Sequence, residues 1–408
     1  MVYRQAISHK NMDIHNYKGQ LERTIVRINE SASISEDNKG IILGFKDHLL
    51  SDGIGLAKIN RYLMDAIKYG LMVDKPFKNA NKEDIRKVVA ELEQTDLAAE
   101  TKKGFKVMLR KLYRFIRGFE QKGEYPDEVK WLSIHIPENH RKLPEELLTA
   151  NEIVAIIQKC HDIRDKALIA ALAESGCRVS EIGTMKIKHV SFEEHGARLT
   201  VNGKTGMRKI LIIHSSPYLQ AWINRHPDNT NPESYLWINP VNGRFLCYAR
   251  IAAILKDAAK KAGIRKRVYP HLLRHSRATE LASIMSDASM KHYFGWVQGS
   301  KMAGIYIHMS GRETDEAILK ASGIEIKKNE AKTAMQPKKC QRCNTINEVT
   351  NIYCRICGFI LDEQKQNELL IQDLKRREAD KLMDDLMEDK EFLRFVLQKI
   401  REKEGNIP

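Results

Sequence analysis

Apolar residues recur at helical spacing through most of residues 15–117, and this pattern limits that part of the chain to a helical fold. The pattern runs through IILGFKDHLLSD, LAKINRYLMDAIKYGLM, NKEDIRKVVAELEQT and AETKKGFKVMLRKLYRFIRGF. In the last segment the apolar residues form one stripe, and lysines and arginines occupy much of the remaining surface. We therefore predict an all-helical domain that packs through one face of this helix and could meet phosphates with the other.

The pattern changes twice further along the chain. Residues 118–148 contain several prolines and glycines and no sustained period, which is typical of a linker. Helical spacing returns at Thr149 and is interrupted by two alternating runs, ARLTVNG and GMRKILIIH, around a turn at Asn202 to Gly206. Such a pair predicts a β-hairpin. Residues 149–322 are thus expected to form a mixed but mostly helical domain.

Charge and composition narrow the functional classes. Lys and Arg number 68 against 53 Asp and Glu among 408 residues, a formal net charge of +15, so a polyanion such as nucleic acid is the expected partner. No apolar run approaches the roughly 18 residues that a membrane-spanning helix needs. The amino-terminal residues lack the apolar core of a secretion signal, and we expect a cytoplasmic protein without a membrane partner.

Five short motifs follow one another in the second domain, and they contain candidates for the groups that cleave a phosphodiester without a metal. They are GCRVSE, NGKTGMR, HLLRHSRAT, FGW and YIHMS. The reaction needs a nucleophile, positive charge on the phosphoryl oxygens and a proton for the leaving oxygen. Arg178 and Arg274 carry planar guanidinium groups that suit phosphate oxygens, and His271 lies one helical turn before Arg274. Lys204 lies in the hairpin turn, from which a flexible ammonium group could reach a leaving oxygen.

At these motifs, and in this order, the chain resembles the tyrosine recombinases, the phage integrase family of DNA strand-transfer enzymes. The resemblance extends over about residues 15–322, because the preceding helical unit is similar to the SAM-like core-binding domain of that family. It implies a site-specific recombinase or integrase that holds double-stranded DNA and works as a homo-tetramer. It implies no cofactor for catalysis.

The same resemblance implies a role for each site residue. Arg178 and Arg274 would clamp the scissile phosphate, Lys204 would be the general acid, and His271 would accept a proton or bind the phosphate. Tyr306 would attack phosphorus and leave a 3′-phosphotyrosyl link with a free 5′ hydroxyl. The remaining members are Trp296, which would donate a hydrogen bond to phosphate, and Glu181, which would support the other groups.

Residues outside this set are expected to be structural. His275 follows Arg274 directly, and a helix turns its side chain about 100° away from that arginine, so we expect a supporting role. Two other functions remain open. A type IB topoisomerase would share the chemistry and relax supercoils as a monomer. A non-catalytic DNA-binding protein would keep the scaffold and act as a regulator or architectural factor.

A separate module follows the second domain. Four of the seven cysteines, Cys340, Cys343, Cys354 and Cys357, form two C-x2-C pairs ten residues apart. Four thiolates at this spacing are typical of a structural zinc ribbon, and a redox dithiol or an iron-sulfur cluster is the alternative. Cys160, Cys177 and Cys247 are expected to be ordinary thiols.

The predicted fold is mainly α with a small β component, an α+β organisation. Its predicted segments are a tail (1–14), a helical core-binding domain (15–117), a linker (118–148), a catalytic domain (149–322), a second linker (323–339), a zinc ribbon (340–362) and an amphipathic helix (363–408). The apolar residues of the last segment could pack on their own chain or on a neighbouring subunit.

Overall fold

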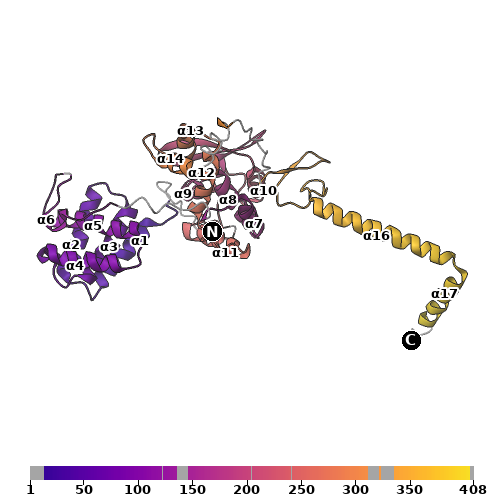
Figure 1. Ribbon diagram of the computed structural model, residues 1–408, viewed down its shortest axis with the longest axis horizontal. Coiled ribbons are helices and arrows are strands. Elements are labelled where there is room, and N and C mark those ends of the chain that lie inside the picture. Colours follow the sequence, from indigo (N-terminus) through magenta and orange to yellow (C-terminus); the bar gives the residue numbers. More distant parts are fainter. Residues whose placement is uncertain are drawn as a thin grey trace, which may run out of the picture. The chain divides into compact units, whose positions relative to one another are not determined.

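The computed structural model describes residues 13–121, 123–135, 146–203, 205–239, 241–310, 321–322 and 335–404. They divide into two compact units, one ending at Glu146 with Leu246–Arg250 added, and the other beginning at Leu147. Helices dominate both units, and the second adds a three-stranded and a two-stranded sheet (Figure 1). The predicted α+β fold is therefore confirmed. Among these residues, no helix is both long enough and apolar enough to cross a lipid bilayer.

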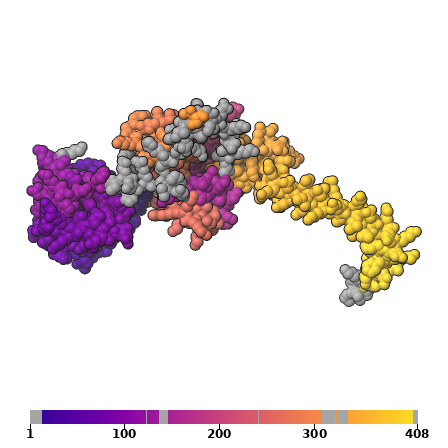
Figure 2. Space-filling model, in the orientation of Figure 1, coloured from indigo at the N-terminus to yellow at the C-terminus, as the bar shows by residue number. Residues whose placement is uncertain are grey.

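The first unit is built from helices. Its elements are α1 (Tyr17–Glu30), α2 (Glu36–Ser51), α3 (Leu56–Met72), the 3-10 turn η1 (Phe77–Asn79), α4 (Lys82–Gln94), α5 (Ala99–Ile116) and the short α6 (Asp127–Lys130). Figure 2 shows their surface as one continuous body, coloured indigo to purple.

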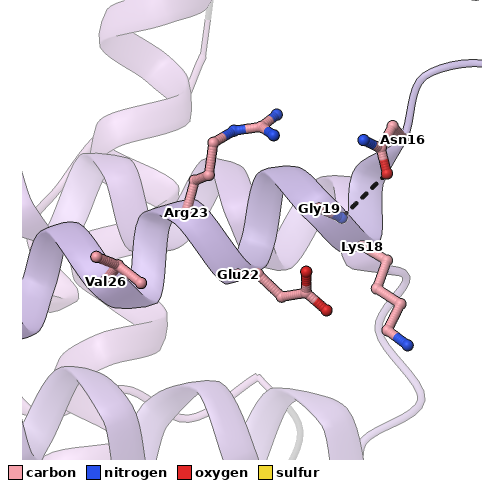
Figure 3. A pocket seen from close by; sticks show the side chains of 6 residues that line it. All are labelled: Asn16, Lys18, Gly19, Glu22, Arg23 and Val26. Atoms are coloured by element: carbon pink, nitrogen blue, oxygen red, sulfur yellow. Dashed lines mark hydrogen bonds between the residues drawn. The ribbon is translucent and has the colours of Figure 1, made fainter.

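Polar side chains determine where several of these helices begin. At the start of α1, the Oδ1 of Asn16 accepts a hydrogen bond from the Gly19 backbone at 3.2 Å (Figure 3). At the start of α4, the Asn81 side chain accepts from the Asp84 backbone, and the Asp84 carboxylate accepts from the Asn81 backbone in return. Both contacts satisfy amide groups that have no partner within the helix.

Two buried tyrosines connect the centre of this unit. The hydroxyls of Tyr69 on α3 and Tyr113 on α5 lie 2.5 Å apart, and the Tyr113 hydroxyl donates to the Phe77 carbonyl at 3.2 Å. Because Tyr113 donates there, Tyr69 is the donor of the pair. Val129 and Leu132, from the segment predicted as a linker, also pack into this core.

The second unit surrounds one almost fully buried helix. Helix α8 (Ile163–Ser175) buries every residue from Ala167 to Ser175 and packs against α10 (Ser216–Arg225) and α12 (Pro270–Ala282). The other helical elements are α7 (Ala150–Gln158), α9 (Val179–Gly183), η3 (Ile187–His189), α11 (Tyr248–Lys261), α13 (Asp287–Phe294) and α14 (Met302–Ser310).

The predicted hairpin is present, and a third strand extends it. Strands β2 (Gly196–Gly203) and β3 (Gly206–Ile212) pair antiparallel, with Gly203 opposite Gly206. The strand that the sequence analysis did not predict, β1 (Val190–Glu193), pairs with the other edge of β2. Alternation along β3 buries Arg208, Ile210 and Ile212 on one face.

The C-terminal part contains a small sheet and two further helices. Strands β4 (Lys338–Lys339) and β5 (Ile346–Asn347) pair antiparallel beside the four cysteines. The predicted amphipathic segment forms two helices, α16 (Glu363–Glu388) and α17 (Lys390–Glu404), drawn yellow in Figure 2. Helix α16 has no buried residue, and Leu370, Ile371 and Leu382 on it are more than half exposed.

We expect Tyr113→Phe to destabilise the first unit more than Tyr69→Phe. Loss of the Tyr113 hydroxyl removes the acceptor for Tyr69 and the donor for Phe77, which costs about 2 kcal/mol, whereas loss of the Tyr69 hydroxyl removes one bond and costs about 1 kcal/mol. Urea unfolding of residues 13–135 or of the whole chain, followed by circular dichroism, measures the difference. Equal losses would contradict the assigned direction of these hydrogen bonds.

Candidate active site and metal centre

The C-terminal end of α13 is the centre of the candidate active site. Gly295 ends this helix in the left-handed conformation, with φ of 61°. The Gly295 amide donates to the His292 carbonyl and the Trp296 amide donates to the Lys291 carbonyl, which is the hydrogen-bond pattern of a Schellman motif. The carbonyls of the next three residues then remain available for side chains.

Three arginines occupy those three successive carbonyls. Nε of Arg208 donates to the Tyr293 carbonyl at 2.9 Å, Nη2 of Arg274 to the Phe294 carbonyl at 2.7 Å, and Nη2 of Arg178 to the Gly295 carbonyl at 3.3 Å. The three guanidinium groups come from β3, α12 and the start of α9. Helix ends of this polarity favour positive charge, so one backbone segment positions all three arginines.

Arg274 also contacts the end of a second helix. Its Nη1 donates to the carbonyl of Gly176, the C-cap of α8, at 2.8 Å. Burial, and next the charge of Arg178, lower the pKa of Arg274 to about 10, so it remains protonated at neutral pH. The guanidinium is stabilised by two helix ends through neutral dipoles, and its charge is therefore not cancelled by these contacts.

Glu181 connects two of the arginines. Its carboxylate accepts from Nη1 of Arg178 at 2.9 Å and from Nη2 of Arg208 at 2.8 Å, and it is 4% exposed. Burial opposes ionisation of Glu181, but the hydrogen bond and charge of Arg208, together with Arg178, outweigh it and hold its pKa below the usual value. The carboxylate thus fixes Arg178, which keeps a third of its side chain exposed.

The hairpin that carries Lys204 lies against this network. Lys204 itself falls outside the described residues. Gly203, the residue before it, packs so closely on the Glu181 carboxylate that a Cβ atom there would collide with it. A Cβ on Gly295 would likewise lie 2.7 Å from Nη1 of Arg208. Both glycines therefore permit the close approach of the hairpin to the arginine site.

Tyr306 on α14 lies in an aromatic stack beside the arginines. Its ring is parallel to that of Trp296 at 5.6 Å between centroids, and Trp296 stacks in turn on Phe294 at 4.9 Å. The Arg274 guanidinium lies 5.5 Å from the Trp296 ring centroid. Tyr306 is 3% exposed, and burial raises the pKa of its hydroxyl to about 12 although the charge of Arg274 opposes this.

Two histidines of α12 extend this stack. Nδ1 of His275 lies 2.5 Å from the Tyr306 hydroxyl. The rings of His275 and His271 meet edge to face, with centroids 4.6 Å apart, and His271 is the exposed member of the pair. The sequence predicts a supporting role for His275, whereas in the structure its Nδ1 contacts the hydroxyl of Tyr306, the residue proposed as nucleophile.

The four cysteines form a second, separate cluster. Their sulfur atoms all lie within 4.8 Å of one another, with 3.5 Å between Cys340 and Cys357 and between Cys343 and Cys354. The two C-x2-C pairs have the same backbone geometry. In each, the carbonyl of the first cysteine accepts a hydrogen bond at 2.9 Å from the backbone amide of the residue four positions later. That residue, Asn344 or Gly358, has a left-handed backbone conformation. Tetrahedral zinc with bonds of about 2.3 Å separates its sulfur ligands by about 3.8 Å, so this donor set fits the ion.

The second unit thus brings two guanidinium groups, Arg178 and Arg274, close to a buried tyrosine, Tyr306. Residues 146–313 match the model of the phage integrase family. The chain is also 25% identical over 270 residues to a tyrosine recombinase of Thermosipho africanus, a match that covers 64% of this chain and 92% of that protein.

Two solved structures have the same fold. The XerH site-specific recombinase bound to its difH substrate matches 75% of this chain and 96% of its own, with a TM-score of 0.52 and 20% identity. A lambda integrase tetramer bound to a Holliday junction matches 69% and 79%, with a TM-score of 0.52 and 17% identity. At these identities the two structures show a likeness of fold.

Two residues of the site were not predicted as functional, although the sequence contains a signal for each. Arg208, Ile210 and Ile212 occupy every second position of β3, and this pattern predicts that the Arg208 side chain lies on the buried face of the hairpin. His275 lies four residues after His271, so the two share a helix face.

Replacing Arg208 with methionine should destabilise the second unit by about 3–5 kcal/mol, because it leaves the Glu181 carboxylate buried with one of its two partners gone. Ionised Glu181 contributes stability above its unfolded pKa, and this contribution is lost as pH falls through its lower folded pKa. Thermal unfolding of the wild type and of Arg208→Met, measured from neutral to acidic pH, tests the loss of stability and its dependence on pH. Arg198→Met, on an exposed pair of the same sheet, is the control and should change little.

Proposed function

We propose that the chain is a site-specific DNA recombinase that cleaves and rejoins strands through a covalent link to Tyr306. The observation that carries the proposal is the convergence of Arg178, Arg274 and the Tyr306–Trp296 stack on the end of α13. The family match and the recombinase relatives support the same activity.

The two arginines bind the phosphate, and the tyrosine attacks it. Arg178 and Arg274 bind the two non-bridging oxygens of the scissile phosphate, and they stabilise the charge that builds up as phosphorus becomes five-coordinate. The Tyr306 oxygen attacks phosphorus and replaces the 5′ oxygen, which leaves a 3′-phosphotyrosyl bond. The energy of the broken phosphodiester is kept in that bond, so a 5′ hydroxyl can reverse the step and join a new strand.

The remaining residues control protons and geometry. Lys204, which follows Gly203 in the sequence, donates the proton to the leaving 5′ oxygen. His271 on the exposed side of α12 binds the phosphate one helical turn from Arg274. The indole N–H of Trp296 donates to a phosphate oxygen, and Glu181 holds Arg178 in place.

The partner is double-stranded DNA, and the working form is a homo-tetramer acting in the cytoplasm. The solved tetramer of lambda integrase on a Holliday junction supports this assembly for a chain of the same fold. The exposed leucines of α16 offer an apolar surface for contact with a neighbouring copy.

The four cysteines hold a structural zinc ion. Four thiolates close a tetrahedral site and leave no position for a substrate, so its contribution is to folding. The ribbon packs against α10, where the Thr350 hydroxyl lies 3.0 Å from that of buried Tyr218 and Arg355 donates to Gln220 at 3.0 Å. Its ordering is therefore coupled to the catalytic domain.

The covalent step is tested with a nicked DNA substrate that lets the cleaved fragment diffuse away, in buffer containing EDTA. We expect the wild-type chain to accumulate a protein–DNA adduct on its recombination site, because the free 5′ end needed for rejoining is lost. Tyr306→Phe should bind the same DNA and form no adduct on a denaturing gel. Tyr235→Phe, a change of the same size at a half-buried tyrosine outside the site, should retain adduct formation.

Two other outcomes would favour the alternative functions. Adducts on DNA without a specific site, together with relaxation of supercoils by a monomer, would indicate a type IB topoisomerase. Binding to DNA with no adduct on any substrate would indicate a regulatory or architectural protein.

The metal proposal predicts about one zinc per chain by elemental analysis. Cys354→Ser should abolish most of this zinc, because it removes one of four ligands, and should make residues 338–362 sensitive to protease. Cys247→Ser is the matched control, since this exposed cysteine lies outside the cluster. A zinc-free wild-type protein with an intact ribbon would contradict the proposal.

A further inference from the structure

His275 is the side chain that the structure places at the hydroxyl of Tyr306. Its Nδ1 lies 2.5 Å from the Tyr306 oxygen, and the two rings have centroids 5.9 Å apart at 39°. The ring of Trp296 is parallel to that of Tyr306, with centroids 5.6 Å apart. The hydroxyl is thereby directed at an imidazole nitrogen while the phenol ring is fixed in orientation.

A nucleophilic tyrosine in this environment needs a proton acceptor. Burial keeps the phenol protonated at neutral pH, with a pKa of about 12, and a neutral phenol is a poor nucleophile. A base that removes the proton during attack must lie within about 2.6–3.2 Å of the oxygen or reach it through one water. Nδ1 of His275 lies at that range before any substrate is bound.

We propose, on the basis of the function proposed above, that His275 is the general base for Tyr306. During cleavage the bond between the Tyr306 oxygen and phosphorus forms, and the hydroxyl proton moves to Nδ1 of His275. The bond between phosphorus and the 5′ oxygen breaks, its electron pair stays on that oxygen, and Lys204 supplies the proton. Rejoining reverses each transfer, so His275 returns the proton to the leaving Tyr306.

This assignment separates the roles of two histidines that lie on one helix face. His271 is exposed, and its position one turn before Arg274 suits a phosphate ligand. His275 is half-buried between His271 and Tyr306, where it contacts the nucleophile. The edge-to-face contact of the two rings, at 4.6 Å, restrains the orientation of His275.

The test measures the rate of adduct formation on the nicked substrate, with an ordinary 5′ oxygen or a bridging 5′ sulfur at the cleavage site. We expect His275→Ala to react about 100-fold or more slowly on both substrates, since a thiolate leaves without a proton but attack still needs a base. Lys204→Ala should be slow with oxygen and close to wild type with sulfur. Added imidazole should restore part of the rate of His275→Ala.

His275→Asn separates proton transfer from positioning. Asparagine can accept a hydrogen bond from Tyr306 but cannot take its proton, so we expect this variant to be as slow as His275→Ala. Replacing Tyr306 with a difluorotyrosine, which ionises far more readily, should speed both variants. His195→Ala, on an exposed histidine in the turn between β1 and β2, is the control and should react like wild type.

Three results would overturn the assignment of His275. The first is a rate for His275→Ala within threefold of wild type. The second is full activity of His275→Asn, which would show positioning only. The third is a slow His275→Ala that neither imidazole nor the acidic tyrosine improves, although gel shift shows normal DNA binding. In all three the wild type still forms its adduct, whereas absence of that adduct would instead refute the proposed function.

Discussion

The bonds between three guanidinium groups and the last carbonyls of α13 determine the arrangement of the whole site. A helix end provides acceptors at fixed spacing and a partial negative charge, so it positions cations from distant parts of the chain without neutralising them. Arg178, Arg208 and Arg274 come from three different elements and meet on consecutive residues. The left-handed Gly295 makes this possible, because it turns the chain after the helix and leaves space for Arg208.

Stabilising these cations with dipoles matters for binding an anion. A carboxylate paired to Arg274 would cancel its charge and compete with phosphate, whereas two carbonyls leave the charge in place. The one carboxylate in the network, Glu181, is shared between Arg178 and Arg208, so the three arginines and Glu181 together carry two net positive charges. Burial, and next the charge of Arg178, lower the pKa of Arg274, so an anion bound there would favour its charged form.

The sequence predicted much of the fold because its signals are local. Helical spacing in residues 15–117 and alternation around Lys204 depend on which face of one element is buried, and both elements formed as expected. The spacing of the cysteines likewise predicted a cluster that the structure contains. The role of Arg208 could not be derived in this way, since its partners Tyr293 and Glu181 are distant in sequence and meet only through packing. The same holds for His275, whose helix position is local but whose partner Tyr306 lies 31 residues away.

Tyr306, the proposed nucleophile, is buried, whereas Arg178, a proposed phosphate ligand, keeps a third of its side chain exposed. Arg178 keeps part of its surface open, and exchanging the 3.3 Å bond to the Gly295 carbonyl for a charged phosphate oxygen is favourable, since charge-assisted hydrogen bonds are about twice as strong as neutral ones. Tyr306, in contrast, is covered by Trp296 and hydrogen-bonded to His275. Trp296 packs both on Tyr306 and on Phe294, whose carbonyl holds Arg274. Any displacement of this indole would therefore act together on Tyr306, the proposed nucleophile, and on Arg274, the proposed phosphate ligand.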